Sequence, residues 1–89
     1  MTARKHLFVS GRVQGVFYRD TCRQVADKEG VAGWASNLRD GRVEIVLEGD
    51  EDAIERVVRW CRMGTAYATV ESVDVSDERP EGLSGFAIR

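Results

Sequence analysis

The chain has 89 residues, with 13 Lys and Arg residues against 15 Asp and Glu residues and a formal net charge of −2. This length suits a single domain, residues 1–89, whose core buries roughly 60–65% of the surface of the unfolded chain. The charge gives no overall positive field to attract nucleic acid, and no segment has the roughly 18 consecutive apolar residues of a membrane-spanning helix.

The first predicted elements are a strand and a helix. Residues His6–Arg12 have strand character, with Leu7 and Val9 on one face and Phe8 on the other. Residues Arg19–Glu29 repeat apolar side chains with the helical period, and a glycine follows at the position where helices commonly end. The run between the two elements is therefore predicted to be a short strand-to-helix loop.

A hairpin is predicted next. Residues Val31–Asn37 form its first strand, and the turn at 38–41 contains the Asp-Gly pair that hairpins favour. Residues Arg42–Glu48 form its second strand, because apolar and polar residues alternate there. The apolar face of this strand consists of Val43, Ile45 and Leu47.

The remaining chain predicts a second helix and two further strands. Asp50 is a suitable N-cap for the helix and Gly64 a suitable end. Its apolar stripe has helical spacing and consists of Ile54, Val57, Val58 and Cys61. Residues Val70–Val75 are expected to form a fourth strand and Gly85–Arg89 a short fifth one, with a polar loop over Asp77–Ser84 between them.

The resulting order, β-α-β-β-α-β with a short additional strand, predicts an α+β fold of the ferredoxin-like α/β sandwich type. Both helices would cover one face of a mainly antiparallel sheet and leave the other face open to solvent. His6 is expected on that open face. Trp34 and Trp60 are expected in or near the core.

Two cysteines, Cys22 and Cys61, lie in different predicted helices, and their separation matches no zinc or redox motif. They are interpreted as buried free thiols of a cytoplasmic protein. Residues Met1–His6 lead directly into a strand without the apolar core of a signal peptide, which supports the same location.

The glycine-punctuated loop within Gly11–Arg19 predicts an anion site. A strand-to-helix loop directs several backbone N–H groups, here those of Gln14, Gly15, Val16, Phe17 and Tyr18, at one point beside the positive end of a helix. The glycine at 15 is the residue best able to take a positive φ, whereas the side chains at 16 and 17 are expected to pack beneath the loop. Arg19 would bind two oxygens of the same anion, since a cation in the first turn opposes the helix dipole and has little structural use there.

Hydrolysis at such a site requires a positioned water, which a neutral amide can hold. Asn37, at the end of the second predicted strand, is the best candidate, although the residues alone favour a turn-forming role for it. No nucleophilic triad and no carboxylate cluster for Mg²⁺ is evident in the sequence. The expected chemistry therefore uses no metal, no cofactor and no covalent intermediate.

The chain resembles the acylphosphatase family along almost its whole length. The run GRVQGVFYR at 11–19 resembles the family's phosphate-binding signature, and GWASN at 33–37 followed by DGRVE at 40–44 resembles its second signature. The resemblance implies that Arg19 binds the substrate phosphate and that Asn37 orients the attacking water. It also implies cofactor-free hydrolysis of a small-molecule acyl phosphate, with inorganic phosphate as a product, and a phosphate oxygen as acceptor of the water's proton.

Three positions depart from the family pattern. Leu38 stands where threonine is common, so a hydrogen bond next to the asparagine is expected to be missing, with an effect on activity. Gly64-Thr65 replaces a common Gly-Pro, and the aromatic residue that often follows Arg89 is absent. These last two departures are expected to leave the chemistry unchanged.

The expected protein is a cytoplasmic, monomeric enzyme with no nucleic-acid or membrane partner. An RNA-binding module of the same fold is the alternative from another class, but the predicted strand 42–48 has no aromatic residue and carries glutamates that would repel a phosphate backbone. A second alternative is a catalytically weak, anion-binding regulatory or accessory domain, which the resemblance to domains of larger carbamoyl-transfer proteins raises.

Overall fold

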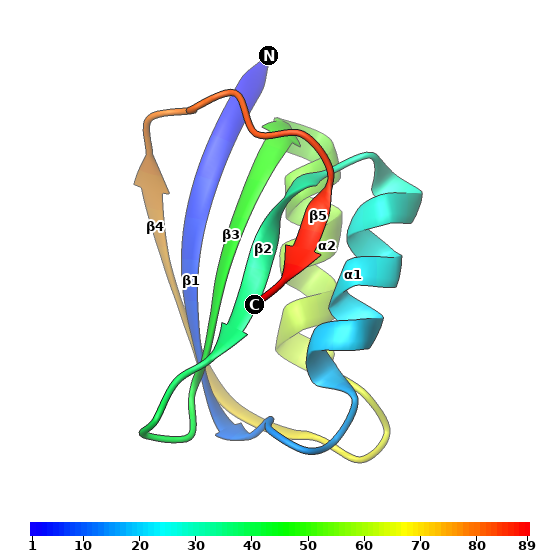
Figure 1. Cartoon of the computed structure of the whole chain (residues 1–89), viewed down its shortest axis with the longest axis vertical. Helices are drawn as coiled ribbons and strands as arrows, with labels where there is room; N and C mark the ends of the chain where they lie inside the picture. Colours follow the sequence, from blue (N-terminus) through cyan, green and yellow to red (C-terminus); the bar gives the residue numbers. More distant parts are fainter.

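The computed structural model describes all 89 residues and has two layers (Figure 1). Its elements are β1 (Thr2–Arg12), α1 (Tyr18–Glu29), β2 (Ala32–Asn37), β3 (Val43–Asp50), α2 (Glu51–Met63), β4 (Thr69–Glu78) and β5 (Phe86–Ile88). The sheet has the order β4-β1-β3-β2-β5, and both helices pack on one of its faces. The predicted ferredoxin-like α+β fold is confirmed, and neither helix is long and apolar enough to cross a membrane.

The sheet is antiparallel except where its last strand, β5, pairs with β2. β1 and β2 each pair antiparallel with β3, and β1 also pairs antiparallel with β4, whereas β5 pairs parallel with β2. β1, β2 and β5 therefore run in the same direction, and their carboxyl ends lie at the same edge of the sheet (Figure 1). This shared edge is where the loop between β1 and α1 begins.

Three of the helix boundaries have a local cause. Gly30 adopts the left-handed conformation, with φ 72°, and its N–H donates to carbonyls of the last turn of α1. At the start of α2, the Asp50 side chain accepts a hydrogen bond from the Asp52 N–H, as an N-cap does. The expected end of α2 at Gly64 is confirmed by the bond from its N–H to the Trp60 carbonyl.

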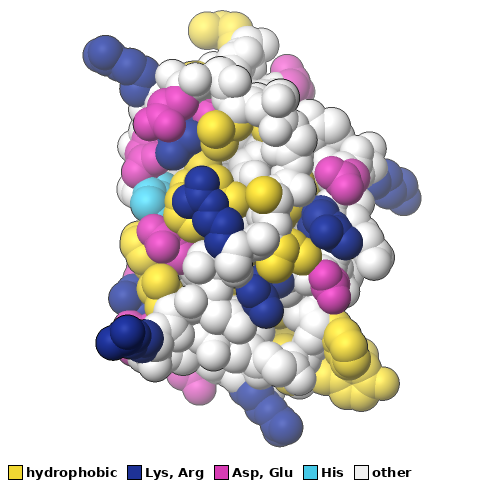
Figure 2. All heavy atoms as spheres, in the orientation of Figure 1, with side chains coloured by type: hydrophobic (Ala, Val, Ile, Leu, Met, Phe, Trp, Pro, Cys, Tyr) yellow, Lys and Arg dark blue, Asp and Glu magenta, His cyan; other side chains and the backbone are white.

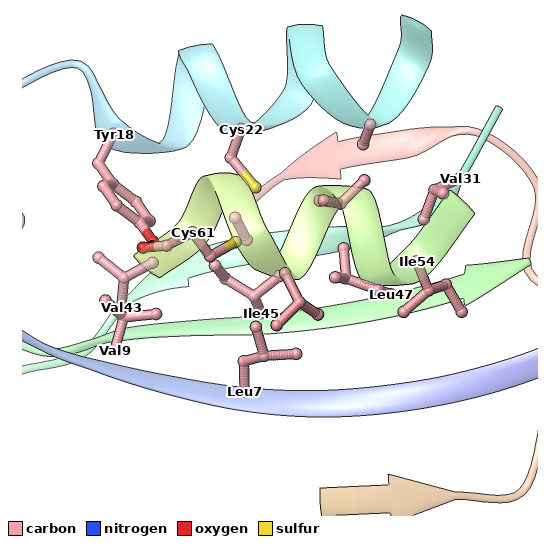
Figure 3. Packing of buried hydrophobic residues seen from close by; sticks show 14 of the residues in the cluster. Leu7, Val9, Tyr18, Cys22, Val31, Val43, Ile45, Leu47, Ile54 and Cys61 are labelled. Carbon is pink, nitrogen blue, oxygen red and sulfur yellow. The ribbon is translucent and has the colours of Figure 1, made fainter. Parts of the chain in front are cut away.

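One core lies between the helices and the sheet (Figure 3). Leu7, Val9 and Ile45 contribute from the sheet, and each is fully buried, which stabilises the fold by about 1.5–3 kcal/mol per side chain. Cys22 and Cys61 are free and fully buried where α1 faces α2, as expected. The interaction with the Cys61 thiol, together with burial, raises the pKa of Cys22, so it stays a neutral thiol.

The open face of the sheet carries aromatic rings between charged side chains. His6 stacks on Phe8 with 4.9 Å between ring centroids, which confirms the expected place of the histidine. Trp34 also lies on this face, half-buried, with the Arg89 guanidinium 4.2 Å from its ring centroid. The expected core position is therefore wrong for Trp34, because neighbours on the open face cover its ring instead.

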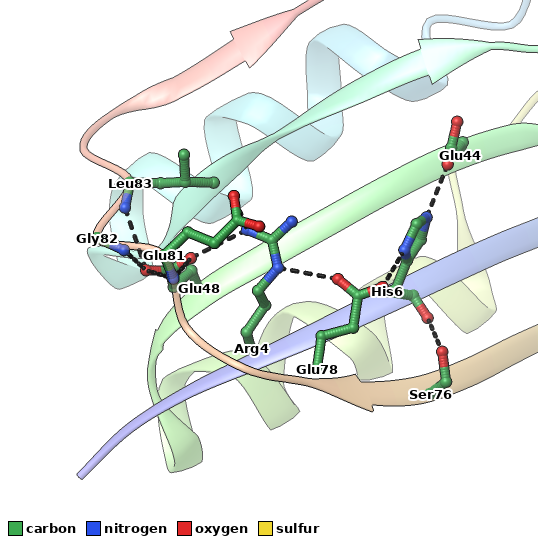
Figure 4. Close-up of polar contacts among 9 residues, drawn as sticks. All are labelled: Arg4, His6, Glu44, Glu48, Ser76, Glu78, Glu81, Gly82 and Leu83. Atoms are coloured by element: carbon green, nitrogen blue, oxygen red, sulfur yellow. Dashed lines mark hydrogen bonds and ion pairs between the residues drawn. The ribbon is translucent and has the colours of Figure 1, made fainter.

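Charged residues extend the sheet beyond the predicted strands. β1 begins at Thr2 rather than His6, and β4 continues to Glu78 into the predicted loop. The Arg4 side chain bonds with Glu48 of β3 and Glu78 of β4 (Figure 4). These ion pairs between strands stabilise the start of β1 and the end of β4, where the sequence is polar.

Candidate active site

The site lies at the edge where β1, β2 and β5 end. A β-bulge in β4 shifts its register with β1 just before this edge, since Ser10 pairs with Ser72, Gly11 pairs with Val70 and Glu71 is left without a partner. At Gly11, φ is 122° and a Cβ atom would lie 2.1 Å from the Thr69 carbonyl oxygen, so no other residue fits. β1 thus runs close against β4 up to Arg12, where the chain enters the loop.

The loop from Val13 to Phe17 has the backbone geometry of an anion-binding nest. Gly15 has φ 72° and Phe17 has φ 62°, whereas Val16 between them has a negative φ. Alternation of this kind turns successive N–H groups to the same side of the chain. No N–H group from Gln14 to Arg19 donates to a backbone carbonyl, and α1 has no side-chain cap, so these donors are available to an anion at the helix N-terminus.

The start of α1 is held in place by the core and by α2. Tyr18 is fully buried, and its hydroxyl donates a 2.7 Å hydrogen bond to the Cys61 carbonyl of α2. Burial raises the pKa of Tyr18, so the hydroxyl remains a donor. The buried Val16 side chain packs beneath the loop, as expected, and the amides of the nest therefore rest on the core.

Arg19 extends from the first turn of α1 toward the end of β5. Its Nη1 atom donates a 2.8 Å hydrogen bond to the Arg89 backbone carbonyl, which fixes the guanidinium while other N–H groups remain available. The carbonyl is within reach because β5 pairs with β2 up to Ile88 and the chain continues toward the site edge. The short last strand thus has a role in the site that the sequence did not reveal.

Asn37 is the last residue of β2, next to the same loop. It is exposed, and its side-chain amide makes no hydrogen bond within the protein, so a turn-forming side-chain bond does not occupy it. A cavity of about 240 Å³ lies between these elements, and Asn37, Arg19 and Gly15 all line it. Val13, Phe17, Tyr18, Asp20 and Ile88 complete its wall. The structure therefore brings the two predicted catalytic residues and the loop together.

Two side-chain hydrogen bonds position the loop from opposite sides. Gln14 Nε2 donates to the Leu38 and Arg42 carbonyls of the β2–β3 hairpin, at 2.7 and 2.9 Å. Thr65 Oγ1 in the α2–β4 connection donates to the Val16 carbonyl at 2.8 Å. The sequence predicts a role only for the backbone N–H of Gln14, and it predicts that Thr65 leaves the chemistry unchanged. A sequence shows such contacts poorly because each joins segments distant along the chain.

Phe17 differs from its sequence-based expectation. Its side chain is 68% exposed instead of packed beneath the loop, because the left-handed backbone turns it outward. The ring lies 6.3 Å from that of Tyr67 in the α2–β4 connection, measured between centroids. Figure 2 shows hydrophobic side chains protruding at the lower right, where these two segments run in Figure 1.

The charges around the cavity suit an anion. A larger hollow of about 500 Å³ lies at the opposite edge of the sheet, but its charged lining groups are the carboxylates Asp27 and Glu48, which repel anions. Nowhere in the chain do three His, Cys, Asp or Glu side chains come together in a way that could hold a metal ion. The cavity at Arg19 is also lined by one carboxylate, Asp20, but it combines the Arg19 guanidinium with the free N–H groups of the loop, and these donors match a phosphoryl group.

Comparisons with known proteins show which family the chain matches. A family model described as Acylphosphatase matches residues 5–88, which include every residue that lines the cavity. The chain is 54% identical over 86 residues to an acylphosphatase from Haloquadratum walsbyi, with 97% of this chain and 92% of that protein covered.

Solved structures show the same likeness. The fold matches a crystal structure of acylphosphatase from Bacillus subtilis with a TM-score of 0.94 and 39% identity, over 100% of this chain and 99% of that one. It matches an acylphosphatase from Coxiella burnetii with a TM-score of 0.95 and 36% identity, over 99% and 93% of the two chains.

Proposed function

The chain belongs to the acylphosphatase family and hydrolyses acyl phosphates, and on that premise we propose that Arg19 and the loop amides bind the phosphoryl group while Asn37 holds the attacking water. The observation that carries this proposal is the single cavity lined by Arg19, Asn37 and the loop. Phosphoryl transfer to water requires donors that stabilise the charge on the phosphoryl group and a group that positions the water. The loop and Arg19 supply the donors, and the free amide of Asn37 can position the water.

In the proposed reaction, the water oxygen attacks phosphorus while the bond between phosphorus and the bridging acyl oxygen breaks. The carboxylate leaves with the electron pair of that bond. One proton of the water stays on the new P–OH group, and a phosphate oxygen takes the other. A carboxylate is a good leaving group, so positioning and charge stabilisation suffice without a general acid.

The loop supplies the charge stabilisation. The N–H groups of residues 14–19 and the positive end of α1 face oxygens on which charge develops, and the Arg19 guanidinium adds a full positive charge. Because the Arg89 carbonyl and the buried Tyr18 fix these donors before substrate arrives, little reorganisation is needed in the transition state.

We also propose that residues 1–89 act as one domain and as a monomer in the cytoplasm, without metal, cofactor or nucleic-acid partner. The net charge of −2 opposes binding to nucleic acid. The large hydrophobic side chains that are exposed are few, namely Met1, Phe17, Met63, Tyr67 and Val75. Such a surface is typical of a monomer, which light scattering of the eluted protein would verify.

The decisive experiment measures hydrolysis of benzoyl phosphate, with EDTA present, by the wild-type protein and by Arg19→Ala and Asn37→Ala. Each substitution is expected to lower kcat/KM by about a thousandfold, because it removes the charge stabilisation or the positioned water. Urea unfolding should show that both variants remain folded.

Arg23→Ala is the matched control, since this exposed arginine lies one turn further along α1 and does not line the cavity. It should keep near-normal activity. Near-normal turnover by Arg19→Ala or Asn37→Ala would refute the assigned role of that residue. The accessory-domain alternative is not favoured, because the relatives matched over nearly the full chain are acylphosphatases.

A further inference from the structure

We infer that the aromatic pair Phe17–Tyr67 binds the acyl side of the substrate, so that the enzyme prefers aromatic acyl phosphates to small ones such as acetyl phosphate. The inference rests on the proposed roles of Arg19 and Asn37, which fix where the phosphoryl group lies. It assigns a function to a surface at the mouth of the cavity that the phosphate chemistry leaves unexplained.

The two rings are exposed without contributing to the core. Phe17 is 68% exposed and Tyr67 70% exposed, and their centroids lie 6.3 Å apart at an interplanar angle of 60°. Exposed aromatic rings in contact beside a cavity form an apolar surface in a place where surface residues are usually polar. Since Phe17 lines the cavity itself, this surface is continuous with the phosphate site.

The backbone at Phe17 supports a functional role. It is the only residue besides glycines with a positive φ, and bulky side chains adopt this conformation only at a cost. The left-handed backbone belongs to the nest, but the nest requires only the N–H group of this residue. A glycine or asparagine would supply that group with less strain, so the ring itself is the feature that needs an explanation.

The geometry of the reaction places the acyl group on this side. In phosphoryl transfer the attacking oxygen and the leaving oxygen lie roughly in line, on opposite sides of phosphorus. Gln14 joins the loop to the β2–β3 hairpin, which follows Asn37. At the other end of the loop, Thr65 of the segment that carries Tyr67 bonds to Val16. Figure 1 shows the hairpin and the α2–β4 connection on opposite sides of the loop. A leaving group directed away from the water at Asn37 is therefore directed toward Phe17 and Tyr67.

The chemistry of the surface determines the substrate class. A benzoyl ring can contact both side chains, whereas an acetyl methyl group is too small to reach across them. One aromatic contact contributes enough to change affinity by about two- to tenfold. The preference should appear in KM, since the contact is made equally in the ground state and in the transition state.

The experiment compares kcat/KM for benzoyl phosphate and acetyl phosphate in the wild-type protein and in Tyr67→Ala, Tyr67→Phe and Val75→Ala. Tyr67→Ala should raise KM for benzoyl phosphate about three- to tenfold and leave acetyl phosphate unchanged. Tyr67→Phe keeps the ring and should behave as wild type. Val75→Ala, which shortens an exposed apolar side chain of β4, should also have no effect.

A second variant tests the ring inside the cavity. Phe17→Gly keeps the positive φ and removes the ring, so the ratio of the two kcat/KM values should fall at least as far as in Tyr67→Ala. Any general damage to the loop affects both substrates and cancels in this ratio. Inhibition by inorganic phosphate provides a separate measure of the loop, and its Ki should be unchanged in Tyr67→Ala.

The outcomes separate the two proposals. If Tyr67→Ala and Phe17→Gly hydrolyse both substrates with the wild-type ratio, the aromatic pair does not bind the acyl group, and the roles of Arg19 and Asn37 are unaffected. If Arg19→Ala and Asn37→Ala stay active, the proposed catalytic arrangement is wrong and the inference fails with it.

Discussion

Gln14 shows how much of this site depends on one side chain. Its amide donates to two hairpin carbonyls, those of Leu38 and Arg42, on either side of the turn after Asn37. The bond at Leu38 holds the backbone directly after the residue proposed to position the water. On the proposed mechanism we therefore expect Gln14 to be a positioning residue, which sets the distance between phosphate and water without contacting either through its side chain.

Replacing Gln14 by Met should lower kcat about 10- to 100-fold, because a displacement of the water by about 1 Å has an effect of this size. Met has a similar length but cannot donate a hydrogen bond. Phosphate should still bind, since the backbone N–H groups of the loop remain. Steady-state kinetics and the Ki of inorganic phosphate measure the two effects, and a Ki that weakens in parallel with kcat would show that the whole loop has collapsed instead.

Some features of single residues could be predicted from the sequence and others could not. Arg19 and Asn37 could be selected from the sequence because their chemistry and motifs are local. The outward direction of Phe17 and the bond from Thr65 could not, since they depend on the φ of one residue and on contacts across the fold. The effect of the Leu38 side chain on activity stays a prediction. The structure adds that the Leu38 backbone carbonyl accepts a hydrogen bond from Gln14.

At the scale of elements, the connection from β4 to β5 is held by one buried carboxylate. Glu48 of β3 is only 3% exposed, and it accepts hydrogen bonds from three successive backbone N–H groups, those of Glu81, Gly82 and Leu83 (Figure 4). Burial favours its neutral form, but these bonds and the one from Arg4 outweigh that effect and lower the pKa of Glu48. β5 follows this anchored connection and leads directly to Arg89, whose carbonyl contacts Arg19.

Glu48→Ala should lower the free energy of unfolding by about 3–5 kcal/mol, because it removes the acceptor of three backbone N–H groups and one of the two carboxylates that hydrogen-bond to the buried Arg4 guanidinium. Glu48→Gln keeps one oxygen acceptor and should cost less. Urea unfolding measures both, with Glu55→Ala as a control at an exposed position of α2. Equal stabilities of the Ala variant and the control would show that other contacts hold this connection.

Strand lengths were the least predictable part of the fold. Element order and type followed from periodicity, whereas the polar ends of β1 and β4 have no strand pattern. They become strands because cations on β1 face anions on its neighbours, with Arg4 and Lys5 opposite Glu78 and Asp77. Pairing across 70 or more residues cannot be recognised in a local window.

At the scale of the whole molecule, His6 joins three strands on the open face. Its ring nitrogens lie 2.6 Å from a Glu78 oxygen on β4 and 2.7 Å from a Glu44 oxygen on β3. Both nitrogens donate only when the ring is protonated. Burial alone would lower the pKa of His6, but the two carboxylates outweigh it and raise the pKa above its usual value of 6.5.

The free energy of unfolding should therefore fall as pH rises through the raised pKa of folded His6. The stabilisation by protonated His6 is complete at pH values below the pKa of His6 in the unfolded chain, near 6.5, since the folded and unfolded states both bind the proton there. Urea unfolding between about pH 5.5 and 9 measures the effect. His6 is the only histidine, so His6→Gln should show a flatter profile. A variant with the same slope as wild type would exclude His6 as the cause.

The position of β1 in the sheet also has a consequence for how the chain reaches this structure. β1 comes first in the sequence but lies inside the sheet, between β3 and β4, and its Arg4 pairs with Glu78. Contacts so distant along the chain require closure of a long loop before they contribute, which slows folding. On the ribosome, β1 therefore has an unpaired edge until β4 has been synthesised, and its charged beginning lowers the risk that this edge pairs with another nascent chain.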